Sequence, residues 1–336
     1  MREIAELAEL SFEEVIERIS SPADTVILFH RSPDADAVGS AFALRELLEG
    51  LGSRAWCLCE SELPERLQFL TGGVQNSVLP NSLPDDFENV RVISVDSASP
   101  SQLGGLWELY GDRVDLMLDH HESGRPYADH YIRPGGAATG EILFDLAKQL
   151  ATDGLIEITD QLCVAIYAAI SADTGGFRFS NVTAETHMRA AELMTRGIDC
   201  AEINHLLFNT FSIEQLRARA AGISNLHLFA GGRIAVITFP YALKVALGLN
   251  DDHLDTLVDV ARSLRGVCVA AAIRQPETEG SFRVSVRSSC SYNVARLCAG
   301  FGGGGHDKAA GCTIHAADAD EAMQKLVAAI DPAELV

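Results

Sequence analysis

Aspartate and histidine side chains gather in a few short segments that could do chemistry together. The segments are His30-Arg-Ser-Pro-Asp34-Ala-Asp36, Asp96, Asp119-His120-His121 and Asp173. If the fold brings them together, the carboxylates repel one another strongly unless divalent cations lie among them. Oxygen ligands with some imidazole and no thiolate suit manganese or magnesium, and the histidines favour manganese. The cluster therefore predicts a divalent-metal site.

Two such ions, about 4 Å apart and bridged by a carboxylate and a water, would activate that water and clamp the phosphoryl oxygens of an in-line displacement. The reaction class that we expect is hydrolysis of a phosphoester. Taken alone, Asp34-Ala-Asp36 could be ordinary turn chemistry. The combination of the segments, with a His-His pair beside Asp119 at the end of an apolar run, carries the hypothesis.

The predicted secondary structure places these segments at one edge of a sheet. Short apolar runs predict strands at 25–29, 90–95 and 114–118. Periodic segments predict helices at 37–51, 140–150 and 161–171. The strands end at His30, Asp96 and Asp119, Thr139 could cap the second helix, and the third helix runs into Asp173. Such alternation indicates an α/β fold with a mostly parallel, doubly wound sheet, whose strand carboxyl ends share one edge.

The second half of the chain has a different pattern. Strands predicted at 267–273 and 281–287 flank a turn signal at 275–280, as in a hairpin. A length of 336 residues also favours two domains over one. We expect a catalytic domain at residues 1–190, a helical linker at 191–215 and a smaller α/β substrate-binding domain at 216–336.

Composition limits the classes of function. Hydrophobic residues make up 47% and charged residues 22% of the chain, as in folded globular proteins. A formal net charge of -21 argues against a groove for long duplex nucleic acid. The amino terminus lacks the basic and apolar regions of a signal peptide, no apolar run is long enough to span a membrane, and the eight cysteines form no Cys-x-x-Cys pair. We therefore expect a cytoplasmic protein with reduced thiols.

The motifs resemble those of the DHH phosphoesterase superfamily, whose name matches Asp119-His120-His121. The other matching motifs are His30-x-x-Pro33-Asp34-x-Asp36-x-x-Gly39-Ser40, Val95-Asp96-Ser97, Asp173-Thr174-Gly175-x-Phe177-Arg178-Phe179-Ser180-Asn181 and Phe301-Gly302-Gly303-Gly304-Gly305-His306-x-x-Ala309-Ala310-Gly311. The last is similar to the signature of the DHH-associated carboxyl-terminal domain. The likeness covers nearly the whole chain and is greatest to the bacterial type that acts on very short RNA (nanoRNase, oligoribonuclease) and on 3'-phosphoadenosine 5'-phosphate (pAp).

The resemblance implies roles for the clustered residues. One metal ion would be held by His30, Asp34 and Asp96, and the other by Asp36, Asp96, His120 and Asp173. The implied ions are two Mn²⁺, with Mg²⁺ or Co²⁺ as possible substitutes. Asp96 would bridge them. His121 would face the scissile phosphate as a donor or acid, and Asp119 would orient its neighbours, so that the implied catalytic residues are Asp36, Asp119 and His121.

The carboxyl-terminal domain would select the substrate. The residues expected to bind it are Arg287, Gly303, Gly304, Gly305 and His306. Arg287 offers a fork for a terminal phosphate, and a run of glycines would let backbone amides approach a ligand closely. Two departures from the family pattern leave substrate detail open: Ala138 where Ser is common, and Asn293 where an acidic residue is common.

The leading hypothesis is hydrolysis of short oligoribonucleotides and of the 3'-phosphate of pAp, with a homodimer as a possible assembly. The alternative is a phosphodiesterase of cyclic dinucleotides or their linear products. A manganese pyrophosphatase would have a different carboxyl-terminal domain without Gly303-Gly-Gly-His306. A single-strand DNA exonuclease would need a longer, more basic chain. A non-enzymatic nucleotide sensor would be expected to lack a metal ligand, and none of the implied ligands is missing.

Overall fold

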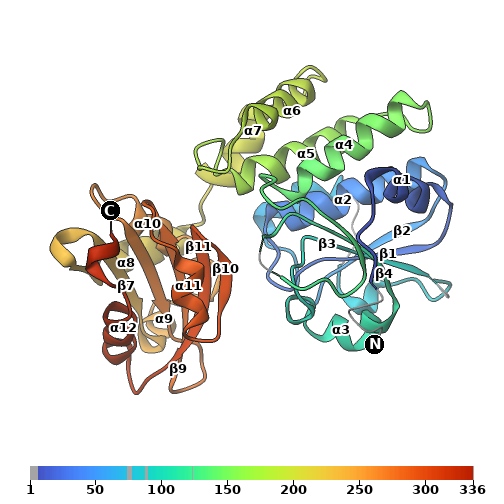
Figure 1. Ribbon diagram of the computed structural model, residues 1–336. Coiled ribbons are helices and arrows are strands. Elements are labelled where there is room, and N and C mark those ends of the chain that lie inside the picture. Colours follow the sequence, from blue (N-terminus) through green and yellow to red (C-terminus); the bar gives the residue numbers. More distant parts are fainter. Residues whose placement is uncertain (1–6, 74–77, 88–89, 123, 336) are drawn as a thin grey trace. The chain divides into compact units, whose positions relative to one another are not determined.

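The computed structural model describes residues 7–73, 78–87, 90–122 and 124–335. It divides into two compact units, with the break between Thr210 and Phe211 (Figure 1). The break falls inside the predicted linker 191–215, because helices α6 (Ala184–Met194) and α7 (Cys200–Asn204) belong to the first unit. The functional division at 1–190, 191–215 and 216–336 stays a prediction.

The first unit is built on a parallel sheet. Its strands are β1 (Thr25–Leu28), β2 (Ala55–Leu58), β3 (Arg91–Val95), β4 (Val114–Asp119) and β5 (Asp129–Ile132). Their order is β2-β1-β3-β4-β5, and each neighbouring pair is parallel. The chain reverses its direction of winding between β1 and β3, and in such sheets ligands bind at the carboxyl ends of the strands beside that point. The predicted doubly wound parallel sheet is confirmed.

Helices cover both faces of this sheet (Figure 1). One face carries α1 (Phe12–Ser20), α2 (Ala35–Gly50), α4 (Thr139–Thr152) and α5 (Asp160–Asp173), and the other carries α3 (Gly105–Tyr110). Alternate residues of β1 serve the two cores: Ile27 packs with α2, and Val26 packs with α3. Short 3-10 helices connect these elements at Glu65–Thr71, Pro80–Ser82, Pro100–Leu103 and Gly111–Arg113, and a π-helical turn follows α7 at His205–Asn209.

Close packing explains one glycine of the first motif. A Cβ added to Gly39 in α2 would lie 2.5 Å from the carbonyl oxygen of Ala165 in α5. The backbones of the two helices therefore approach each other closely at this point, which holds the amino-terminal half of α2 against the layer of helices. Close packing of α2 against α5 therefore requires glycine at position 39, three residues after Asp36 in the sequence.

The second unit has a mixed sheet. Its strands are β6 (Leu226–Phe229), β7 (Ile234–Phe239), β8 (Val269–Arg274), β9 (Ser281–Ser288), β10 (Gly304–His306) and β11 (Ala309–His315), in the order β10-β11-β9-β8-β7-β6. Only the pair β7 and β8 is parallel among these described strands. The predicted hairpin is confirmed, since β8 and β9 pair antiparallel.

Helices also cover both faces of the second sheet. They are α8 (Ile213–Ser224), α9 (Tyr241–Ala246), α10 (Leu257–Arg262), α11 (Val294–Ala299) and α12 (Ala319–Ala328), with 3-10 turns at Ala230–Gly232, Asp252–Leu254 and Pro332–Glu334. The cores of α8 and α10 lie on one face, and those of α11 and α12 on the other. Within the described ranges, no helix has the length and apolarity that crossing a bilayer requires.

Candidate metal centre and active site

The fold brings together every predicted site residue of the first unit. His30 follows β1, Asp96 follows β3, and Asp119 ends β4, with His120 and His121 directly after it. Asp34 caps the amino terminus of α2, with Asp36 in its first turn, and Asp173 is the last residue of α5. The site thus lies at the carboxyl ends of the strands that flank the reversal between β1 and β3.

Asp96 lies at the centre of the cluster. One carboxylate oxygen, Oδ2, is 3.6 Å from His30 Nε2. The other, Oδ1, is 3.7 Å from both His120 Nε2 and His121 Nδ1. The residue is 2% exposed and has a φ of 50°, a left-handed conformation that is uncommon for a residue with a side chain. This backbone geometry at the end of β3 turns the carboxylate toward all three histidines.

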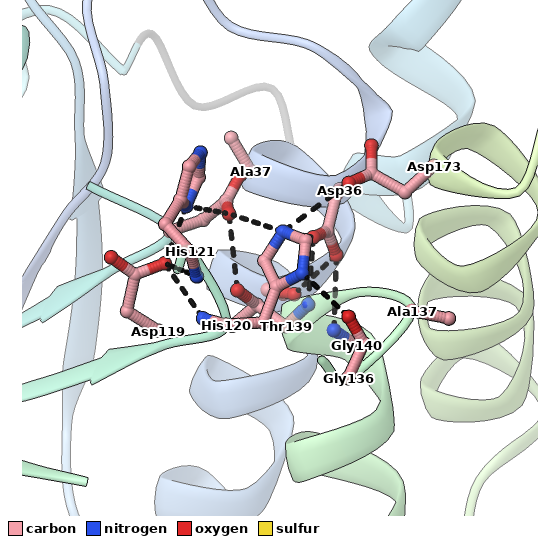
Figure 2. A network of polar contacts seen from close by, with 12 residues as sticks. Asp36, Ala37, Asp119, His120, His121, Gly136, Ala137, Thr139, Gly140 and Asp173 are labelled. Atoms are coloured by element: carbon pink, nitrogen blue, oxygen red, sulfur yellow. Dashed lines mark hydrogen bonds and ion pairs between the residues drawn. The ribbon is translucent and has the colours of Figure 1, made fainter. Parts of the chain in front are cut away.

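The ring of His120 faces the remaining carboxylates. Its Nε2 is 3.3 Å from Asp173 Oδ2 and 3.7 Å from Asp36 Oδ2. On the other side of the ring, Nδ1 lies 3.0 Å from the carbonyl oxygen of Gly136, so a proton on Nδ1 is donated to that oxygen (Figure 2). This tautomer directs the Nε2 lone pair into the carboxylate cluster, as a metal-binding imidazole requires.

Asp36 is completely buried and accepts hydrogen bonds from three donors. The backbone N–H groups of Thr139 and Gly140 donate to it at 2.7 and 3.0 Å, and the Ser40 hydroxyl donates at 3.0 Å. Figure 2 shows this carboxylate at the start of α4, beside His120. The prediction that Thr139 caps α4 is wrong: the N-cap position is Ala138, whose side chain makes no cap bond, and Asp36 supplies the acceptors instead.

Asp119 organises the end of β4. Its Oδ1 accepts hydrogen bonds from the backbone N–H of His120 at 2.7 Å and from His121 Nδ1 at 2.7 Å. The residue is 1% exposed. Oδ2 of Asp119 is buried and has no hydrogen-bond partner among the described residues. The contacts of Oδ1 hold the backbone of His120 and the ring of His121, while His121 Nε2 lies on the side of its ring that is turned away from this bond.

The buried carboxylates of the cluster repel one another and shift one another's pKa values. Burial, and then the charges of Asp96 and Asp173, raise the pKa of Asp36 well above its ordinary range. Burial also raises the pKa of Asp173. The pKa of Asp96 lies below its ordinary value, because contacts with the surrounding histidines outweigh its burial. Several buried carboxylates therefore compete for protons with the histidines between them, and a bound cation would relieve that competition.

The residues fit divalent cations by geometry and by chemistry. Ligand atoms of His30, Asp34 and Asp96 lie within 4.8 Å of one another, and so do those of Asp36, Asp96 and His120. A third such group joins Asp96 with Asp119 and His121. The donors are carboxylate oxygens and imidazole nitrogens without a thiolate, which suits manganese or magnesium. Asp96 belongs to all three groups, so adjacent cation sites would share its carboxylate.

A supporting layer around the site was not predicted. Glu141 of α4 is 4% exposed and accepts from Ala137 N at 3.1 Å and from the Thr186 hydroxyl at 2.7 Å. Asn181 donates from Nδ2 to the carbonyl oxygens of both Ala137 and Asp173, at 3.0 Å each. These bonds hold the loop that carries the Gly136 carbonyl against α4 and α5. Asn181 lies within a quoted motif, and Glu141 lies three residues after Ala138, one of the two departures from the family pattern, which was the available signal.

In the second unit, the strand register places Arg287 and His306 on one face of the sheet. Arg287 of β9 pairs with Ala309 of β11, and Ala309 pairs with His306 of β10. Directly paired residues share a face of the sheet, so the two basic side chains flank a residue with only a methyl group. Both Arg287 and His306 are half-buried.

Backbone conformation and strand packing require glycine at several positions of the run 302–305. Gly302 has a φ of 73°, and a Cβ added to Gly303 would lie 2.1 Å from the carbonyl oxygen of Gly311. Gly305 combines a φ of 139° with a Cβ position 2.6 Å from the Ala309 carbonyl oxygen. Backbone conformation and close strand packing therefore require glycine at three of these positions, 302, 303 and 305. A Cβ on Gly304 would meet nothing within 4 Å.

Comparison with known families agrees with this arrangement. Residues 24–170 match the DHH family, N-terminal domain, and residues 237–332 match the DHHA1 domain. Each match lies within one of the two compact units. The chain belongs to the DHH family and is a phosphoesterase of that family.

Its relatives include two curated bacterial proteins of similar length. The chain is 30% identical to the bifunctional oligoribonuclease and PAP phosphatase NrnA of Thermus thermophilus, covering 94% of this chain and 91% of the relative. It is 27% identical to the protein of the same name from Bacillus subtilis, covering 90% and 93%. A solved structure of an exopolyphosphatase-related protein from Bacteroides fragilis has the same fold, with a TM-score of 0.83, 23% identity and 95% of each chain covered.

Proposed function

We propose that the protein hydrolyses phosphoester bonds in very short oligoribonucleotides and removes the 3'-phosphate of pAp, with divalent manganese. The observation that carries this proposal is the sharing of Asp96 between adjacent groups of metal-binding side chains. The names of the relatives, which specify oligoribonuclease and PAP phosphatase activities, support the choice of substrates. The substrates are short because an acidic chain offers little to a long polyanion.

In this proposal, the shared carboxylate divides the ligands into two sets. His30, Asp34 and Asp96 hold one ion, and Asp36, Asp96, His120 and Asp173 hold the other. Mn²⁺ is expected, and Mg²⁺ or Co²⁺ are possible substitutes. When bound, these ions supply Lewis acidity toward the phosphoryl oxygens and make a water molecule easier to deprotonate.

The remaining side chains orient the reacting groups. Asp119 accepts the Nδ1 proton of His121, which fixes the ring and its tautomer. The other ring nitrogen, Nε2, can then act on a phosphoryl oxygen or on the leaving oxygen as a hydrogen-bond donor when protonated. Asp119 is thus assigned to orientation, and His121 to contact with the substrate.

The second unit is assigned to the end of the substrate away from the cut. Arg287 and His306, which share a face of the sheet, would bind a terminal phosphate, and the exposed backbone at Gly304 would approach the ligand. Gly303 and Gly305 would shape the strand that carries these groups. We predict fast turnover of substrates of a few nucleotides and weak activity on long RNA.

The test is a comparison of rates with Mn²⁺ on pAp, on RNA of two to about twenty-five nucleotides, on a cyclic dinucleotide and on pyrophosphate. The proposal expects the fastest turnover on pAp and on RNA of two to about five nucleotides. Fast pyrophosphate turnover with untouched dinucleotides would sink it. A cyclic dinucleotide cleaved faster than dinucleotides would favour the alternative, an activity named for a relative from Listeria monocytogenes, of which this chain covers 48%.

Arg287→Ala tests the assignment of the second unit. It should mainly raise KM, because it removes a contact to a non-reacting phosphate. Arg283→Ala is the matched control, since Arg283 lies on the same strand and face and is bound to Asp251 at 3.4 Å. Equal KM values for wild type and Arg287→Ala would contradict the role of Arg287.

A further inference from the structure

One residue of α4 contacts two of the clustered carboxylates at once. The backbone N–H of Thr139 donates to Asp36 Oδ2 at 2.7 Å, and its hydroxyl donates to Asp96 Oδ1 at 3.0 Å. Asp36 lies on α2 and Asp96 follows β3, so that Thr139 joins segments of three different elements. All three residues are buried.

We propose that Thr139 is a positioning residue that sets the orientation of the Asp96 carboxylate relative to Asp36, and thereby the affinity of the site for divalent cations. This inference deepens the proposed function and rests on it, because it assumes that these carboxylates hold cations. Thr139 itself is not assigned as a metal ligand or as a group that touches the substrate.

The hydrogen bond from the Thr139 hydroxyl orients the Asp96 carboxylate, so that each of its oxygens faces a different histidine or pair of histidines. Oδ1 receives the Thr139 hydroxyl and lies nearest to His120 and His121, while Oδ2 lies nearest to His30. A carboxylate that serves cations on both sides must keep its plane fixed. The strained backbone of Asp96, with its φ of 50°, sets the direction of the side chain but leaves rotation about the Cβ–Cγ bond open.

Thr139 is itself held rigidly. It is 0% exposed, and a β-branched side chain has few rotamers in a helix. The next residue packs so closely that a Cβ on Gly140 would lie 2.6 Å from the Cβ of Ala169 in α5. Glu141 then fixes the preceding loop through Ala137 N. The hydroxyl therefore approaches Asp96 from a support that cannot easily shift.

A role in starting the helix does not explain this hydroxyl. Ala138 occupies the N-cap position, and Thr139 is the first residue inside α4. A capping hydroxyl would accept from a backbone N–H of the first turn, whereas the Thr139 hydroxyl donates to a carboxylate of another element. The bond thus serves Asp96 rather than the helix.

The experiment is a titration of metal-free full-length protein with Mn²⁺, in which free Mn²⁺ is measured by electron paramagnetic resonance. Thr139→Val removes the hydroxyl, keeps the branched shape and keeps the N–H bond to Asp36. We expect Mn²⁺ affinity to fall by about 10- to 100-fold, as for other groups that orient metal ligands. Thr139→Ser should retain affinity near that of the wild type, because it restores the hydroxyl.

The matched control is Thr25→Val, which also removes a buried hydroxyl, at the start of β1 and away from the cluster. It should leave Mn²⁺ affinity unchanged. Wild-type affinity in folded Thr139→Val would overturn the inference, and so would an equal loss in the control. If Thr139→Val does not fold, Thr139→Ala replaces it in the same titration. Failure of both to fold would make the hydroxyl a folding group and also overturn the inference.

The titration separates this inference from the proposed function. If none of the proposed substrates is hydrolysed by the wild type while Thr139→Val binds Mn²⁺ weakly, the inference stands and the substrate assignment fails. If the substrates are hydrolysed and Thr139→Val binds Mn²⁺ as tightly as the wild type, the proposed function stands and the inference fails.

Discussion

Asp36 has two separable tasks, since it caps α4 and faces the candidate cation site. Asp36→Ala removes the acceptor for the N–H groups of Thr139 and Gly140 and for the Ser40 hydroxyl. The hydroxyl can rotate to another acceptor, but the two buried N–H groups cannot. At about 1–3 kcal/mol for each unsatisfied donor, the metal-free first unit should lose about 2–6 kcal/mol of stability.

Relief of charge repulsion opposes this loss but is the smaller effect. The pKa of Asp36 is raised by burial and by Asp96 and Asp173, so the metal-free protein already relieves part of the repulsion by protonation. With Mn²⁺ at about 100 times its dissociation constant, each occupied site stabilises the wild type by about 2.7 kcal/mol. If Asp36→Ala loses one site, its deficit should grow to about 5–9 kcal/mol in Mn²⁺.

The assay is urea unfolding in EDTA and in Mn²⁺, followed by tryptophan fluorescence. The chain has two tryptophans, Trp56 and Trp107, and both lie in the first unit, so the signal reports that unit. Asp153→Ala is the control, because Asp153 is an exposed acceptor at the other end of α4 and should change stability by less than about 0.5 kcal/mol. Equal deficits in EDTA and Mn²⁺ would refute the metal role, and no deficit in EDTA would refute the capping role.

Other predictions follow from the same contacts. Without metal, stability in thermal melts should fall as pH rises above about 6.5, the ordinary value for histidine, because neighbouring aspartates hold the pKa values of His30 and His120 well above it and the stabilising protonated forms are lost as pH rises. Asp36 acts in the same direction, because its raised pKa makes ionisation costly in the folded protein. The stabilisation by Mn²⁺ should instead grow with pH. A metal-free stability that does not change with pH would contradict the first expectation. A new N-cap typically stabilises a helix by about 1 kcal/mol, but Asp36 already accepts from the first turn of α4. Ala138→Ser should therefore change the free energy of unfolding by less than about 0.5 kcal/mol. A full gain of about 1 kcal/mol in urea unfolding would refute capping by Asp36. The side-chain amide of Asn293 donates to Asp307, whereas a carboxylate at position 293 would repel Asp307. Asn293→Asp should therefore destabilise α11 by about 1 kcal/mol at neutral pH and by less in acid. Amide hydrogen exchange of residues 294–299 measures this loss, and unchanged exchange would contradict the prediction.

Features encoded locally were predictable from the sequence. The strands that end at His30, Asp96 and Asp119 are short apolar runs followed directly by polar residues, and a parallel sheet brings such ends to one edge. An N-cap residue is a local signal of the same kind: Asn293 starts the helix Val294–Ala299 by a bond to its own first turn. The weakly apolar edge strand β5 was missed, since Asp129–Ile132 has no alternating pattern and pairs through its backbone alone.

Features that depend on distant contacts were not predictable. The cap of α4 comes from Asp36, 103 residues before Thr139. The residues next to the helix therefore predicted the wrong capping side chain, Thr139. The glycines at 303 and 305 are required by the register of β10 against β11, which sequence alone did not fix. The left-handed backbone of Asp96 is also set by the surrounding fold rather than by its residue type.

In the proposed site, one carboxylate, that of Asp96, is shared by adjacent divalent cations. The most direct test is the electron paramagnetic resonance spectrum and stoichiometry of the Mn²⁺-loaded protein, compared with Asp96→Asn. We expect two Mn²⁺ per chain with an exchange-coupled spectrum, and loss of the coupling in Asp96→Asn. A single Mn²⁺ per chain, or two ions without coupling in the wild type, would contradict it.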